Sequence, residues 1–161
     1  MQKIGPGLWF DGRAQEAAEF YVSVFPNSHV VDDARYPEGP RGEAGTVMTV
    51  RFVLDGEEFM GLNGGPLYLF TPAVSFVVMC DSQTEIDDYW AKLTDGGVEV
   101  QCGWLTDRFG LSWQIVPEVL AGMLNSPDKA AAKRANAAML AMIKLDIAKL
   151  QAAYDGIEPT S

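Results

Sequence analysis

Positive charge is scarce in this sequence. Twelve Lys and Arg stand against 22 Asp and Glu, which gives a formal net charge of -10 over 161 residues. A protein that wraps a phosphate backbone needs a basic stripe, and these twelve residues do not cluster into one. The composition therefore argues against DNA or RNA as a partner.

Cysteine and long apolar runs are also scarce. Cys80 and Cys102 are the two cysteines, and both lie among apolar residues. We therefore expect buried thiols in a reducing compartment, with a reactive Cys102 as the alternative, and no disulfide framework. No segment approaches 18 apolar residues, and Met1 to Gly7 lacks the apolar run of a signal peptide. We expect a cytoplasmic protein with no membrane contact.

What the sequence does contain is typical of one globular domain spanning 1–161. Hydrophobic residues make up 48% and charged residues 21%, close to the globular average. A strand is predicted over Ile4 to Phe10, followed by a helix over Ala14 to Phe25 whose apolar residues recur at three and four positions. Three more strands are predicted over His29 to Ala34, Gly45 to Asp55 and Glu57 to Asn63, with a hairpin turn at Asp55-Gly56 and an irregular loop at 36–44.

The second half repeats this order of elements. A strand over Ala73 to Met79 precedes a helix that Ser82 or Thr84 caps and that Asp95-Gly96-Gly97 ends near Leu93. Further strands are predicted over Val98 to Cys102, Trp104 to Thr106 and Leu111 to Val116. The helices superpose at an offset of 69 residues. The predicted fold class is α+β, with two βαβββ modules (1–65 and 70–117) that form a curved mixed sheet around a cleft.

Residues 118–156 are predicted to form a C-terminal helical extension. One helix is expected from Pro127 to about Met142, with Asn125 to Asp128 as its cap, and another from Asp146 to Tyr154, closed by Gly156. Ala138, Met139 and Met142 form an apolar stripe that packs on the body or on a second subunit. Because open sheet edges can also be covered by a second copy, we expect a homodimer.

Five segments carry a family resemblance: Leu8-Trp9-Phe10-Asp11-Gly12, Ala17-Ala18-Glu19-Phe20-Tyr21, Gly61-Leu62-Asn63-Gly64-Gly65, Gln101-Cys102-Gly103-Trp104-Leu105 and Phe109 to Pro117. Together they resemble the PhnB-like branch of the vicinal-oxygen-chelate superfamily. The resemblance covers nearly the whole chain. It implies paired βαβββ modules around a cavity, where enzymes of the superfamily, such as glyoxalase I and extradiol dioxygenases, hold a divalent metal with His, Glu or Gln.

Members of this branch are often labelled 3-demethylubiquinone methyltransferases. The usual methyltransferase places its nucleotide cofactor at a Gly-rich turn that opens a helix. Here Gly64-Gly65 leads into Pro66 and strand-like residues, so we interpret it as the connection between modules. The sequence predicts no cofactor.

The repeat assigns the superfamily's metal-ligand positions to Ile4, Met60, Ala73 and Gln114. Gln114 alone among them offers a hard oxygen ligand, and a divalent cation needs three or more suitable groups. We therefore expect no metal site. The single histidine, His29, begins a strand away from these positions and is expected at the surface. Glu58, Ser112, Asp107 and Arg108 are candidate acids or bases, but their spacing forms no recognisable catalytic pair.

Strand alternation assigns Leu8, Phe10, Leu62 and Val77 to the concave face as well. The candidate ligand-binding residues are Phe10, Met60, Asn63, Ser75, Trp104, Ser112 and Gln114. Such a lining suits either a small-molecule pocket or a filled core. Three functions stay open: a metal-independent protein that binds an aromatic or quinone-like molecule, an enzyme acting on such a molecule, or a dimerising scaffold.

Overall fold

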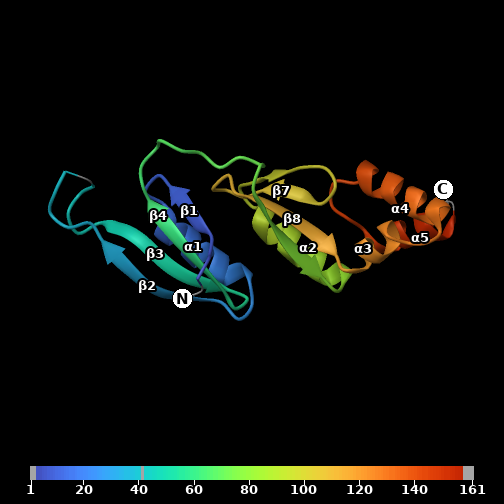
Figure 1. Ribbon diagram of the computed structural model, residues 1–161, viewed down its shortest axis with the longest axis horizontal. Helices are drawn as coiled ribbons and strands as arrows, with labels where there is room; N and C mark the ends of the chain where they lie inside the picture. The colour runs from blue at the N-terminus through green and yellow to red at the C-terminus, as the bar shows by residue number, and fades with distance from the viewer. Residues whose placement is uncertain (1–2, 41, 158–161) are drawn as a thin grey trace. The chain divides into compact units, whose positions relative to one another are not determined.

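The computed structural model describes residues 3–40 and 42–157. The chain divides into two compact units, Met1–Phe70 and Thr71–Ser161, which are coloured blue to green and green to red in Figure 1. Each unit contains a βαβββ module with a four-stranded mixed sheet, so the predicted α+β fold class and the duplication are confirmed. Within the described residues, no helix is both long and apolar enough to cross a membrane.

The first module consists of β1 (Gly7–Phe10), α1 (Ala14–Val24), β2 (His29–Arg35), β3 (Val47–Leu54) and β4 (Glu57–Asn63). Its strand order is β1-β4-β3-β2, with β1 parallel to β4 and the other pairs antiparallel. Helix α1 covers one face, where alternate strand residues form a core with it: Leu8, Phe10, Tyr21, Val50, Phe52 and Phe59. The other face of this sheet carries no helix of the module and is called its open face.

The predicted hairpin turn at Asp55-Gly56 is confirmed. Asp55 has φ 45° and Gly56 has φ 85°, the two left-handed conformations that a tight two-residue turn between twisted strands requires. The turn fixes the register of β3 on β4, in which Arg51 pairs with Met60. It thereby decides which side chains share the open face.

The second module consists of β5 (Ser75–Cys80), α2 (Gln83–Thr94), β6 (Val98–Glu99), β7 (Trp104–Thr106) and β8 (Ser112–Pro117), in the order β5-β8-β7-β6. Ser82 is the N-cap of α2, and its side chain accepts a hydrogen bond from the Glu85 amide. Strand β6 is shorter than predicted. It ends before Cys102, which has φ 62°, and Gly103, with φ 80°, because consecutive left-handed residues turn the chain out of the sheet.

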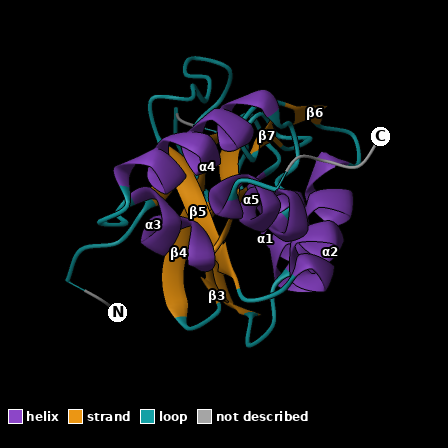
Figure 2. Ribbon diagram, turned by 90° about the vertical axis from the view of Figure 1, so that its right-hand side faces the viewer, coloured by secondary structure: helices purple, strands orange, loops and turns teal. Residues whose placement is uncertain are grey.

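The extension contains three helices, α3 (Val119–Leu124), α4 (Lys129–Ala141) and α5 (Ile147–Asp155), which gather at one end of the second sheet (Figures 1 and 2). Helix α3 was not predicted, because six residues are too few for a helical period to stand out. The expected start of α4 was also wrong, since Asp128 is the N-cap and Pro127 lies before it. Gly156 closes α5 in a left-handed conformation, as predicted.

The apolar stripe of α4 packs inside the chain. Ala138, Met139 and Met142 lie against a cluster of buried side chains formed by Leu120, Met123, Ala135, Leu145 and Leu150. Backbone hydrogen bonds also join the region after α4 to the module: the Cys102 amide donates to the Met142 carbonyl at 2.8 Å, and the Gly103 amide to the Ile143 carbonyl at 2.7 Å. The stripe therefore packs within its own chain. The prediction of a homodimer then rests on the sheet edges alone.

Candidate functional site

Two rows of side chains cross the open face of the second sheet, which is the face opposite the buried side chains of Leu105, Trp113 and Ile115. Gln114 on β8 pairs with Val77 on β5 and with Trp104 on β7, so these three residues form one row. Ser112 pairs with Ser75 and Thr106 in the same way and forms the next row. The structure thus brings together four of the seven predicted ligand-binding residues: Ser75, Trp104, Ser112 and Gln114.

Gln114 is held in one orientation on this face. Its Nε2 donates to Ser75 Oγ at 2.9 Å. Among the described residues its Oε1 accepts no hydrogen bond, and Val77 beside it is 53% exposed. The amide oxygen is therefore available between an apolar residue and an indole.

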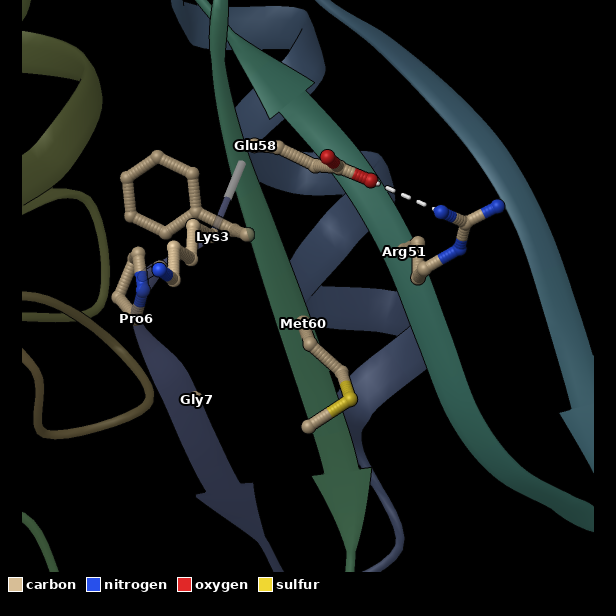
Figure 3. A pocket seen from close by; sticks show the side chains of 8 residues that line it. Lys3, Pro6, Gly7, Arg51, Glu58 and Met60 are labelled. Carbon is tan, nitrogen blue, oxygen red and sulfur yellow. Dashed lines mark hydrogen bonds and ion pairs between the residues drawn. The ribbon is translucent and has the colours of Figure 1, made fainter. Parts of the chain in front are cut away.

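A pocket of about 190 Å³ lies on the open face of the first sheet, around Met60 (Figure 3). Arg51 lies beside it and donates from Nη1 to Glu58 at 2.9 Å and from Nε to Asp32 at 2.8 Å. These hydrogen bonds lower the pKa of the Asp32 carboxyl and raise the pKa of Arg51. Sequence reasoning missed Arg51, although a lone charge within the apolar run of Val47 to Leu54 was a signal.

The face predicted for Phe10 is wrong. Met60 on the open face pairs with Gly7, so Leu8 and Phe10 point to the opposite, helix-covered face. Phe10 is buried there, with its ring at 5.3 Å from that of Phe70. The first strands of the two modules correspond at an offset one residue larger than that of the helices, since Gly7 corresponds to Val77, and a slip of one residue moves every side chain of a strand to the other face.

The strand pairing also contradicts two of the four predicted metal-ligand positions. Ile4 precedes β1, and Ala73 lies in the turn before β5. The partners of Met60 and Gln114 in the parallel pairs are Gly7 and Val77. The pair in the first sheet offers a hydrogen and a thioether, and the pair in the second offers an isopropyl group and one amide, so neither pair suits a divalent cation, which takes imidazole, carboxylate or several oxygen ligands. Nowhere in residues 3–40 and 42–157 do three His, Cys, Asp or Glu side chains gather as a metal centre would need.

Asn63 has a structural role that the sequence did not indicate. Its Oδ1 accepts from the Ala14 amide at 2.8 Å, at the N-terminus of α1, and its Nδ2 donates to the Val47 carbonyl at 3.0 Å. The Tyr36 hydroxyl donates to its backbone carbonyl at 2.5 Å. Because its amide ties β4 to α1 and β3, Asn63 is not free to orient a ligand as predicted, although it borders a second pocket of about 580 Å³.

Three of the four candidate acids and bases, Glu58, Asp107 and Arg108, are held in structural contacts, whereas Ser112 Oγ has no hydrogen-bond partner among the described residues. Asp107 is buried and accepts from the amides of Phe109 and Leu111 and from the indole of Trp113. Arg108 donates to Asp95, and Glu58 accepts from Arg51. His29 is exposed at the start of the edge strand β2, as expected.

Both thiols are free, but their surroundings differ. Cys80 is fully buried, and burial, together with the charges of Glu85, Asp81 and Glu118, raises the pKa of its thiol to about 12. Cys102 is only partly buried. The prediction of two buried thiols is therefore right for Cys80 alone.

A disulfide reagent at pH 8 should label one thiol per folded chain and two per unfolded chain. A raised pKa leaves Cys80 as the unreactive neutral thiol at this pH, whereas Cys102 is accessible. The measurement is a colorimetric thiol count with and without guanidinium. The Cys102→Ser variant is the control and should give no rapid labelling. Two rapidly labelled thiols in the folded protein would contradict this assignment.

Comparison with known protein families identifies a family for this chain. Residues 2–116 match the model of the family described as 3-demethylubiquinone-9 3-methyltransferase. The match spans both βαβββ modules and ends before the helical extension. A comparison with curated proteins finds no match.

Solved structures with the same fold agree with this match. A putative 3-demethylubiquinone-9 3-methyltransferase, PhnB protein, from Bacillus cereus is 38% identical over 72% of this chain and 99% of its own, with a TM-score of 0.66. A protein from Pseudomonas aeruginosa is 22% identical over 73% and 98%, with a TM-score of 0.61. The fosfomycin resistance protein FosX from Listeria monocytogenes, solved with Mn(II) and a sulfate ion, is 14% identical over 77% and 97%, with a TM-score of 0.53.

Proposed function

We propose a function for this chain, which belongs to the 3-demethylubiquinone-9 3-methyltransferase family, in the PhnB-like branch of the vicinal-oxygen-chelate superfamily. In this proposal it is a metal-independent protein that binds a flat aromatic or quinone-like molecule. The observation that carries this proposal is the row of Val77, Gln114 and Trp104 on the open face of the second sheet. The row combines one stacking surface, one apolar side chain and one oriented amide.

Each member of the row has a role in binding. Trp104 is only partly buried and offers an indole against which a planar ring can stack, and the exposed Val77 extends the apolar surface. Gln114, oriented by Ser75, presents Oε1 as an acceptor to a hydroxyl or amine on the ligand. A few placed polar groups within an apolar lining are the usual make-up of a small-molecule site.

Metal independence is supported by the residue types at the paired positions. Met60 and Gly7 in the first sheet, and Gln114 and Val77 in the second, supply one oxygen ligand between them. A single amide oxygen holds a divalent cation too weakly to compete with water.

A second candidate function is methyl transfer to a quinone, which the family's description favours. The fit for S-adenosylmethionine is poor. Gly64 and Gly65 follow β4 and lead into a stretch without helix, whereas a nucleotide site of the usual kind needs a glycine turn that opens one. We also propose a homodimer, because both sheets have edge strands that a second copy can cover.

Native mass spectrometry of freshly purified, untagged protein tests these proposals together. We expect a dimer without a stoichiometric divalent metal and without retained S-adenosylmethionine after its addition. We further expect calorimetry to detect 2-naphthol binding, weakened about tenfold or more in Trp104→Ala because stacking on an aromatic side chain is lost.

The matched control is Leu140→Ala, which trims an exposed residue of α4 outside the site and should bind as the native protein does. A stoichiometric metal lost in Gln114→Ala, or equal binding by Trp104→Ala and the native protein, would overturn the proposed function. Saturable binding of S-adenosylmethionine would favour the methyltransferase instead.

A further inference from the structure

The turn that precedes Trp104 is held from two sides. Cys102 and Gly103 both have a left-handed backbone, with φ 62° and 80°. This conformation is costly for a residue with a side chain, such as Cys102, and it persists where the surroundings hold it. On one side, the Gly103 carbonyl accepts from the Ile115 amide of β8 at 2.8 Å. On the other side, the Cys102 and Gly103 amides donate to the helical extension.

The contacts from the extension come from one short piece of chain, Met142 to Asp146, which joins α4 to α5 and is called the connecting segment. The carbonyls of Met142 and Ile143 accept from the turn. Leu145 is fully buried and packs on the turn, because a Cβ at Gly103 would lie 3.0 Å from Leu145 Cδ1. The turn therefore lies between β8 and the connecting segment.

The connecting segment is itself fixed to α2. Gln83 Nε2 donates to the Leu145 carbonyl at 3.2 Å, and Gln83 Oε1 accepts from the Ile147 amide at 2.8 Å. Lys144 forms an ion pair with Asp87 on the same helix. The family match ends at residue 116, before the extension begins. The extension therefore adds a fixed support for this turn to the part of the chain that identifies the family.

We infer that Leu145 is a positioning residue for Trp104, so that the helical extension sets the affinity of the proposed aromatic site. This inference rests on the proposed function, because it concerns the stacking residue of that same site. Trp104 follows Gly103 directly, and its carbonyl accepts from the Val100 amide at 2.8 Å. A shift of the turn therefore moves the indole relative to Gln114, its partner on β8. A binding site loses affinity when the groups that support it no longer fix its geometry.

The variant Leu145→Ala tests this role by removing the packing against the turn. We expect it to bind 2-naphthol about fivefold more weakly in calorimetry, because the indole is no longer held in one position. We also expect the Cys102 and Gly103 amides to exchange their hydrogens about tenfold faster, since the carbonyls that accept from them are held less firmly. NMR measures this exchange without any ligand.

Leu150→Ala is the matched control. Leu150 is also fully buried and belongs to the same cluster, but it lies on α5, outside the connecting segment. Because the same side chain is lost, both variants should unfold at similarly lowered temperatures. Below those temperatures, Leu150→Ala should keep the native affinity and the native exchange at the turn. Leu145→Met nearly conserves the side-chain volume and should restore both readouts.

Gln83→Ala gives a second test that leaves the buried cluster intact and therefore serves where Leu145→Ala does not fold. It releases the connecting segment from α2, because the side-chain amide no longer holds the Leu145 carbonyl and the Ile147 amide. Both readouts should change in the same direction as in Leu145→Ala, by a smaller factor.

The outcomes separate this inference from the proposed function. Equal changes in Leu145→Ala and Leu150→Ala would overturn the role of Leu145, as would faster exchange at the turn with native affinity for 2-naphthol. Native readouts in both Leu145→Ala and Gln83→Ala would overturn it too. If the native protein does not bind 2-naphthol, the proposed function fails, whereas faster exchange confined to Leu145→Ala would still support the positioning of the turn.

Discussion

Asp107→Ala should lower the free energy of unfolding by about 3–5 kcal/mol, because a buried carboxylate with several hydrogen bonds is removed. Asp107 Oδ1 accepts from the amides of Phe109 and Leu111, at 2.8 and 3.1 Å, and Oδ2 accepts from Trp113 Nε1 at 2.9 Å. Alanine leaves these donors without their acceptor at a site where two of the three hydrogen bonds are buried. Urea unfolding followed by tryptophan fluorescence measures the loss.

Asp107→Asn is the matched control. Its amide keeps the oxygen that accepts from the two backbone amides but turns an NH₂ group toward the indole N–H, so two donors face each other. We expect about half the destabilisation of Asp107→Ala, with the change concentrated in Trp113 emission. If both variants are as stable as the native protein, the turn does not depend on this carboxylate and the structural role assigned to it is wrong.

The modules were predictable because their signals are local and repeated. The spacing of Ala17, Tyr21 and Val24 recurs in Ile86, Trp90 and Leu93, and each of these six residues is buried as the helical period requires. The turn at Asp55-Gly56 was predictable for the same reason, since two adjacent residues specify its conformation.

The faces of the strands were harder to predict because they depend on pairing across the sheet. An offset that is right for α1 and α2 assigned Phe10 to the face of Met60, whereas the parallel pair β1–β4 assigns that face to Gly7. Four residues of β1 are too few to show their own alternation. The positions within β8 were predicted correctly because Ser112 and Gln114 lie two apart in a single strand.

Two site features had little or no sequence signal. Asn63 contacts Ala14 and Val47 only because the fold brings 14, 47 and 63 together, and no spacing in the chain announces such a contact. Likewise, the missing partner of Ser112 Oγ is a property of the packed sheet. The sequence could name a serine on the correct face, but it could not distinguish a satisfied hydroxyl from an unsatisfied one.

Gly97 occupies a position that tolerates no side chain. A Cβ there would overlap the Thr106 carbonyl oxygen and would lie only 3.0 Å from both the Asp107 Cα and the Leu93 carbonyl oxygen. All three are backbone atoms, so no rotamer change relieves the overlap. The sequence indicated Gly97 only as part of the end of α2, and its close packing on β7 is the additional reason for glycine.

Gly97→Ala should therefore lower the free energy of unfolding by about 4 kcal/mol or prevent folding, because α2 must move away from β7 to admit the methyl group. Gly122→Ala is the matched control: its Cβ meets nothing within 4 Å, and alanine favours helix α3, so stability should rise slightly. Since β7 also carries Trp104, a folded Gly97→Ala protein should bind 2-naphthol more weakly, as calorimetry would show. A variant with native stability and native affinity would mean that α2 and β7 are not packed this closely.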